Sequence, residues 1–147
     1  MPIAVRTNET TWDGTLAAGR GVLRGDSGAL DGQEVTWASR TEAPDGRTSP
    51  EELCAAAHSS CFAMALALTL GEEHARPEQM VVRATVTLDE VDGVPTIVSS
   101  ALDVEGRVPG MDAAAFEAAV GQAAELCPVS RLFTGAKITV AARLREG

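Results

Sequence analysis

The stretch of sequence that decides the fold is Ser49-Pro-Glu-Glu-Leu-Cys-Ala-Ala-Ala-His-Ser-Ser-Cys-Phe-Ala-Met-Ala-Leu-Ala-Leu-Thr-Leu-Gly71. Ser49 can cap a helix, Pro50 suits the first helical position, and Glu52 completes a Ser-x-x-Glu capping box. Gly71 supplies a natural stop at the other end. The sequence therefore predicts one long central helix from Pro50 to about Gly71.

This helix carries no charged side chain from Leu53 to Leu70. A helix that is apolar all round is covered on both sides. A chain of 147 residues rarely encloses a helix so completely, so the pattern favours a second subunit. The run Ala55–Gly71 contains His58 and two serines, and is interpreted as a buried core helix rather than a membrane span.

The residues before the helix favour short strands separated by turns. Segments with β-leaning composition are Thr10–Thr15, Gly19–Arg24 and Glu34–Ser39, and they predict an antiparallel meander. The stretch Ala43–Thr48 is a loop by composition.

The residues after the helix predict a hairpin. Met80–Asp89 alternates apolar and polar residues, Asp92-Gly93 marks a turn, and Thr96–Val108 returns as the partner strand.

A second helix and a last strand complete the predicted order. The helix starts at Asp112 and is interrupted at Pro128, and its apolar stripe is Phe116, Val120, Ala123 and Cys127. Lys137–Leu144 closes the chain as a strand with alternate residues facing inward. We therefore expect an α+β fold with antiparallel pairing, formed by residues 1–147 as a single domain.

Composition narrows the class of protein. The net charge of −9 argues against a nucleic-acid partner, because phosphate binding needs clustered lysine and arginine. The first residues lack an apolar leader, so secretion is not indicated. Three cysteines, an odd number, do not make a structural disulfide framework. We expect a cytoplasmic protein, and in the reducing cytoplasm a disulfide is more often transient and catalytic.

The spacing of the cysteines restricts which of them can pair. Cys54 and Cys61 lie about 10 Å apart along one helix, whereas a disulfide needs Cα atoms within roughly 7 Å. If Cys61 has a redox partner within its own chain, that partner is therefore Cys127. Pro128 makes Cys127 the expected cap of a short helix over 128–133, where the helix dipole favours a thiolate. Cys61, in mid-helix, is expected to receive no such help.

An activated Cys61 would need a nearby cation. Arg40, just before the helix, is a candidate, and Glu51 could orient its guanidinium through a two-point charge pair. Glu51 precedes Cys61 by ten residues, about 15 Å along a continuous helix. Either the helix is broken or Glu51 acts on the Cys61 of a second subunit, and we favour the second subunit.

Each of these residues also has a purely structural interpretation. A helical cysteine is usually a small packed side chain, Arg40 is a surface arginine, and Glu51 is a carboxylate that suits a first helical turn. His58 is more often a satisfied core histidine than a base or a ligand.

A zinc site is a second alternative, because Cys54, His58 and Cys61 lie on one helical stripe and Cys127 could add a fourth ligand. One ion bound through zinc–sulfur bonds of about 2.3 Å cannot reach two sulfurs about 10 Å apart, so no metal is predicted.

The segment Thr48–Leu66, together with Cys127-Pro-Val-Ser130, resembles the OsmC/Ohr family of peroxidases, named for osmotically inducible and organic hydroperoxide resistance proteins. Trp12-Asp-Gly, Ser27-Gly-Ala-Leu30 and Val108-Pro-Gly-Met-Asp112 extend the resemblance over essentially the whole chain. Ala-Ala-His58 and Cys127-Pro-Val-Ser are similar to the OsmC branch. The resemblance implies an OsmC/Ohr-like intertwined homodimer with an active site at each subunit interface.

By the same resemblance, Cys61 is the peroxidatic nucleophile and Cys127 the resolving thiol. Arg40 corresponds to the thiolate-activating arginine, with Arg47 as a competitor, and Glu51 to the glutamate that positions it. Such proteins use no metal, haem or flavin, and the resemblance assigns no role to the cysteine at position 54.

The implied function is reduction of organic hydroperoxides, and less readily of hydrogen peroxide, in stress defence. An external dithiol such as a lipoyl group would reduce the Cys61–Cys127 disulfide. Apolar neighbours such as Phe62, Met64 and Phe133 would favour alkyl hydroperoxides. The alternative is a stress-induced binding protein that holds a small apolar ligand, in which the cysteines are merely buried. No membrane association is expected.

Overall fold

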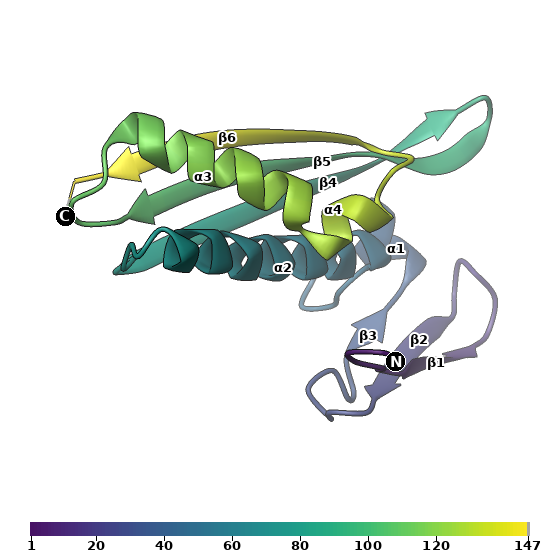
Figure 1. Ribbon diagram of the computed structural model, residues 1–147. Helices are drawn as coiled ribbons and strands as arrows, with labels where there is room; N and C mark the ends of the chain where they lie inside the picture. Colours follow the sequence, from purple (N-terminus) through teal and green to yellow (C-terminus); the bar gives the residue numbers. More distant parts are fainter. Residues whose placement is uncertain (147) are drawn as a thin grey trace. The chain divides into compact units, whose positions relative to one another are not determined.

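The computed structural model describes residues 1–146, which form an α+β chain of six strands and four helices (Figure 1). The chain divides into two compact units, one spanning Met1–Leu53 and one from Cys54 onward. The expected α+β class is confirmed. That residues 1–147 form a single domain stays a prediction.

The first unit is a three-stranded antiparallel sheet in the order β1-β2-β3. Its strands are β1 (Asn8–Asp13), β2 (Arg20–Gly25) and β3 (Glu34–Val35). The predicted antiparallel meander is therefore confirmed.

The strand predicted over Glu34–Ser39 is wrong beyond its first two residues, because the chain turns into helix α1 (Trp37–Thr41). The side chain of Thr36 accepts a hydrogen bond from the backbone N–H of Ser39 at 2.9 Å, and Ser39 Oγ accepts one from the Thr36 N–H at 2.9 Å. This reciprocal capping box outweighs the β-leaning composition of the segment.

The long helix α2 spans Pro50–Glu72, so the predicted start is confirmed and the end lies one residue past Gly71. Ser49 Oγ accepts a hydrogen bond from the Glu52 N–H at 3.1 Å, which is one half of the predicted capping box. The Glu52 carboxylate accepts a 2.6 Å bond from the Thr48 hydroxyl, which ties the preceding loop to the helix.

The second unit contains a sheet in the order β4-β5-β6, formed by β4 (Gln79–Val91), β5 (Val94–Arg107) and β6 (Lys137–Arg145). The β4–β5 hairpin turns at Asp92 and Gly93, which both have positive φ, so the predicted turn is confirmed.

Strand β6 runs parallel to β5, so the expectation of purely antiparallel pairing is wrong for this strand. The cause is the connection, because helices α3 (Ala113–Leu126) and α4 (Pro128–Leu132) lie between the two strands in the chain. A helical crossover returns the chain to the end where β5 began, and parallel pairing follows.

The hydrophobic core of the second unit lies between the sheet and two helices, α2 and α3 (Figure 1). Its largest fully buried apolar side chains are Phe62, Leu66, Leu70, Val104 and Phe116. The predicted apolar stripe of α3 is buried, and the inward residues of β6 pack on the same core, as expected.

Helix α2 is covered on one side only within a single chain. Phe62 and Leu66 are buried, whereas Met64 is 74% exposed and Leu68 is 58% exposed. By length and composition alone, α2 could also cross a membrane, a property it shares with core helices of soluble proteins. The prediction that both sides of α2 are covered stays open until a second subunit is tested.

Candidate active site

The structure brings two cysteine thiols together in the second unit. Cys61 lies in the middle of α2 and is half-buried, whereas Cys127, between α3 and α4, is fully buried. The two thiols lie close enough for Cys127 to raise the pKa of Cys61. A partly accessible sulfur in contact with a buried one can be oxidised from solvent and then captured by its neighbour.

Three surroundings set the pKa of Cys61. Burial is the largest and raises the pKa above its ordinary value, because the charged thiolate loses solvation. A hydrogen bond from the backbone of Val129 lowers it, and the Cys127 thiol raises it through its hydrogen bond and its charge. None of these groups is a cation, so within the part of the chain described here burial prevails and Cys61 is held as the thiol.

Helix α4 acts on Cys61 rather than on Cys127 alone. Cys127 is the N-cap of α4 and Pro128 follows it, as predicted. The next residue, Val129, contributes the backbone hydrogen bond that favours the Cys61 thiolate. The expectation that Cys61 receives no help from a helix end is therefore wrong, because packing brings the first turn of α4 to the middle of α2.

His58 is a fully buried histidine with both ring nitrogens engaged. Its Nδ1 lies 2.6 Å from the hydroxyl of Ser100 on β5, and its Nε2 lies 2.7 Å from the hydroxyl of Ser130 on α4. The ring of Phe133 meets the imidazole edge-on, with centroids 5.2 Å apart. Burial lowers the pKa of His58, so the ring is neutral. The interpretation of His58 as a satisfied core histidine is confirmed.

Arg40 and Glu51 form the two-point pair that the sequence suggested, within the first unit. Arg40 Nε donates to Glu51 Oε1 at 2.9 Å, and Nη2 donates to Oε2 at 2.8 Å. Glu51 is buried, and the Arg40 side chain is 29% exposed. Arg40 belongs to α1, and Ser39 Oγ donates to the Thr48 carbonyl at 2.9 Å, so α1 is fastened to the chain that enters α2.

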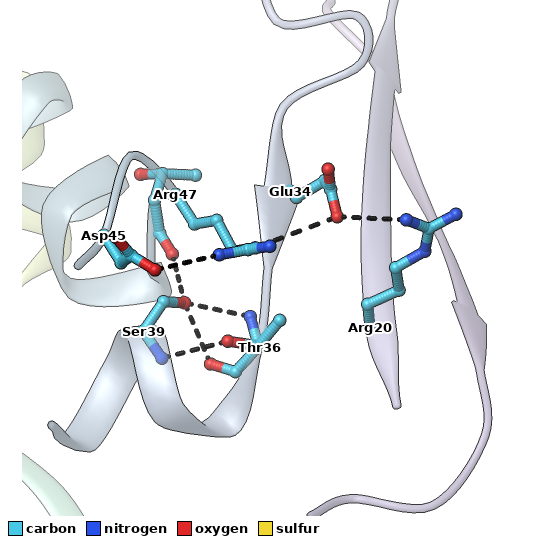
Figure 2. A network of polar contacts seen from close by, with 7 residues as sticks. Arg20, Glu34, Thr36, Ser39, Asp45 and Arg47 are labelled. Carbon is cyan, nitrogen blue, oxygen red and sulfur yellow. Dashed lines mark hydrogen bonds and ion pairs between the residues drawn. The ribbon is translucent and has the colours of Figure 1, made fainter. Parts of the chain in front are cut away.

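Arg47, the competing arginine, has different partners, which Figure 2 shows. Its guanidinium lies 3.6 Å from the Asp45 carboxylate and 3.9 Å from that of Glu34, and its side chain is 41% exposed. Arg20 pairs with the same Glu34 at 3.4 Å. These are loose surface contacts, whereas the carboxylate of Glu51 fixes the plane of Arg40.

The four predicted site residues thus form two pairs that belong to different compact units: Arg40 with Glu51, and Cys61 with Cys127. Cys54 lies seven residues before Cys61 on the unbroken helix α2, so the spacing argument against their pairing stands.

The prediction that Phe62 would be an apolar neighbour of the substrate is wrong, because Phe62 is fully buried in the core. Met64 is exposed, and Phe133 is half-buried against His58.

Sequence reasoning missed the backbone amide of Val129 and the serines on either side of His58. The available signal was the run Cys127-Pro-Val-Ser130, which predicts a helix start but not what the helix start contacts. Within residues 1–146, no group of three or more histidine, cysteine or acidic side chains could hold a metal ion. The expected absence of a metal stays a prediction for metal analysis of the purified protein.

Residues 43–142 match the family model described as OsmC-like protein. The chain belongs to this family. The match includes Glu51, Cys61 and Cys127, and Arg40 lies just outside it.

Relatives within the family cover nearly the whole chain. The chain is 39% identical to the peroxiredoxin OsmC of Escherichia coli over 141 residues, which covers 96% of this chain and 97% of that protein. It is 29% identical to an organic hydroperoxide resistance protein of Xanthomonas axonopodis over 108 residues, 73% of this chain and 74% of that protein.

Solved structures of OsmC-like proteins share the fold. An organic hydroperoxide resistance protein OsmC from Legionella pneumophila superposes with a TM-score of 0.76 at 18% identity, covering 97% of this chain and 98% of that one. The protein OhrB of Bacillus subtilis superposes with a TM-score of 0.63 at 25% identity, covering 95% and 98%. The predicted OsmC/Ohr-like fold is confirmed.

Proposed function

We propose that this protein is a thiol-dependent peroxidase that reduces organic hydroperoxides to alcohols. The observation that carries the proposal is the contact between a half-buried Cys61 thiol and a fully buried Cys127 thiol. Membership of the OsmC-like family supports it, since its relatives include a peroxiredoxin and organic hydroperoxide resistance proteins.

The proposed reaction has three steps. The Cys61 thiolate attacks the terminal oxygen of the hydroperoxide, the O–O bond breaks, and the alkoxide takes a proton and leaves as alcohol. The Cys127 sulfur then attacks the Cys61 sulfenic acid, forming the S–S bond and releasing water. An external dithiol, for which a lipoyl-type group is our candidate, returns two electrons by thiol–disulfide exchange.

The nucleophile needs a positive charge that its own surroundings do not supply. Burial raises the pKa of Cys61, and the Val129 amide only partly offsets it. Arg40, oriented by Glu51, is the proposed source of that charge and would also stabilise the developing alkoxide. Arg40 is favoured over Arg47 because two short hydrogen bonds orient its guanidinium.

Two subunits would build each active site. Glu51 precedes Cys61 by ten residues on α2, about 15 Å along an unbroken helix. The exposed apolar face of the same helix, which includes Met64 and Leu68, is the surface that a second copy would cover. Such a homodimer would bring Arg40 and Glu51 of one chain to Cys61 of the other.

Peroxide consumption with excess dithiol tests the proposed reaction. We expect Cys61→Ser to abolish turnover of tert-butyl hydroperoxide, and Cys127→Ser to react once and then cycle poorly. Cys54→Ser, a thiol change on the same helix, should turn over like the wild type. Undiminished turnover in Cys61→Ser would end the proposal, and normal cycling in Cys127→Ser would remove its resolving role.

Mixed dimers test the two-chain site. In this scheme the Cys61→Ser homodimer is inactive and the Arg40→Met homodimer is strongly impaired, but co-expression assembles one site that has both Arg40 and Cys61. We expect activity to return in the mixture. Light scattering should show a dimer, and Leu68→Glu should weaken it. An active monomer, or a mixture that stays inactive despite forming mixed dimers, would contradict the two-chain site.

The proposed setting is the cytoplasm, where reduced dithiols are available to return the enzyme to its thiol form. The role we propose there is defence against hydroperoxides formed under oxidative stress.

A further inference from the structure

Helix α4 has only five residues, yet its N-terminal end supplies the two groups that act on the Cys61 thiol. Cys127 is its N-cap, and the backbone of Val129 bonds the Cys61 sulfur. A helix this short has too few internal hydrogen bonds to be stable by itself. Something outside α4 must therefore hold its first turn against α2.

His58 makes that connection. It lies three residues before Cys61, so the two side chains share one face of α2. Its Nε2 is 2.7 Å from Ser130 Oγ, one residue after Val129 on α4. On the other side, Nδ1 is 2.6 Å from Ser100 Oγ, on the central strand β5. The imidazole thus links α4 to the sheet, with no exposed surface of its own.

We propose that His58 is a positioning residue which, through Ser130, holds α4 so that Cys127 and the Val129 amide stay against the Cys61 sulfur. This inference rests on the proposed peroxidase function. The step it governs is the resolving one, in which Cys127 attacks the Cys61 sulfenic acid, the S–S bond forms and water leaves. His58 takes no part in bond making, because both its nitrogens are held by serine hydroxyls.

The two serines offer a matched pair of variants. Ser130→Ala and Ser100→Ala each remove one of the two hydroxyl groups that hydrogen-bond the His58 ring, but only Ser130 lies on α4. After one equivalent of cumene hydroperoxide, a dimedone probe traps sulfenic acid in competition with disulfide formation. We expect Ser130→Ala to resolve about tenfold more slowly, the effect of losing one buried hydrogen bond, and Ser100→Ala to be slowed less.

A second pair keeps the test valid where a serine variant does not fold. In His58→Gln the amide can reach the position of Nε2 and bond Ser130, whereas in His58→Asn it reaches only the position of Nδ1 and Ser100. Resolution should survive better in His58→Gln. A role in core packing alone would not separate the two variants in this direction.

The results of these experiments distinguish a failure of the positioning role of His58 from a failure of the proposed peroxidase function. A wild-type protein that forms no Cys61–Cys127 disulfide would overturn both. A wild type that forms the disulfide would leave the function standing. In that case, wild-type resolution in Ser130→Ala, or equal slowing in both serine variants, would overturn the positioning role of His58.

Discussion

The N-terminal unit and the thiol-bearing unit differ in what holds them together. Within residues 1–53, Leu23 is the single buried hydrophobic side chain, and polar contacts such as the Arg40–Glu51 pair fasten the loops. Every member of the core cluster around Phe116 belongs to the second unit. A small unit without a substantial core gains little stability from burial within itself.

The two units also hold different groups of the proposed active site. The first unit contributes an ion pair in which a buried carboxylate orients a cation, and the second contributes two thiols in a mostly uncharged environment. In the proposed mechanism neither pair is sufficient alone, because burial raises the pKa of Cys61 and no cation lowers it among the described residues of its own unit. In the proposed mechanism, assembly of two subunits, rather than folding of the thiol-bearing unit, is the step that activates the Cys61 thiol.

The largest expected effect is on the free energy of unfolding, and it follows from the difference in core packing between the two units. Phe116 is fully buried and its ring lies against Gly106, where an added Cβ would come within 2.5 Å. We expect Phe116→Ala to lower the free energy of unfolding by about 3–5 kcal/mol, and Leu23→Ala by about 2 kcal/mol. Urea denaturation of the two variants measures this. Equal losses would contradict the view that only the second unit has a substantial core.

The two arginines of the first unit provide the next test. Arg40→Met should lower kcat/KM for cumene hydroperoxide by about a hundredfold, the usual effect of removing a group that stabilises developing negative charge. Arg47→Met should lower it by less than about fivefold, since surface ion pairs contribute little. Steady-state kinetics with a saturating dithiol measures both. A larger loss in the Arg47 variant would reassign the activating role.

The pH dependence gives the smallest of the three effects. Burial raises the pKa of Cys61, so the reactive thiolate fraction should grow about tenfold per pH unit below that pKa. Arg40 should lower the midpoint, and Arg40→Met should move it upward. Because the folded state holds this proton more tightly than the unfolded chain, stability should fall as the pH rises through the folded pKa.

Alkylation of Cys61 by iodoacetamide across pH measures the midpoint. A background of Cys54→Ser and Cys127→Ser leaves one reactive thiol, and the same background with Arg40→Met provides the comparison. Identical midpoints with and without Arg40→Met would show that Arg40 does not activate the Cys61 thiolate.

Local signals in the sequence were sufficient for the elements that depend on neighbours along the chain. The cap at Ser49 and the turn at Asp92 and Gly93 each act within a few residues, and both were predicted correctly. The helix α1 was missed because its capping partner at position 39 is a serine, whereas the usual capping box has Glu or Gln there.

Features that depend on tertiary packing could not be read in the same way. The parallel pairing of β6 follows from the path of α3 and α4 across the sheet. The bond from Val129 to Cys61 joins residues far apart in the chain, and no spacing rule connects them. The pairing of Arg40 with Glu51 was predicted, but from the chemistry of a guanidinium beside a carboxylate rather than from their spacing.

The central claim is that peroxide converts the contact between Cys61 and Cys127 into a disulfide, and intact mass with peptide mapping tests it most directly. After one equivalent of cumene hydroperoxide, we predict the loss of two hydrogen atoms and a single linked pair of peptides containing Cys61 and Cys127. An unchanged mass, or oxygen added to cysteines without a link between these two, would contradict the account.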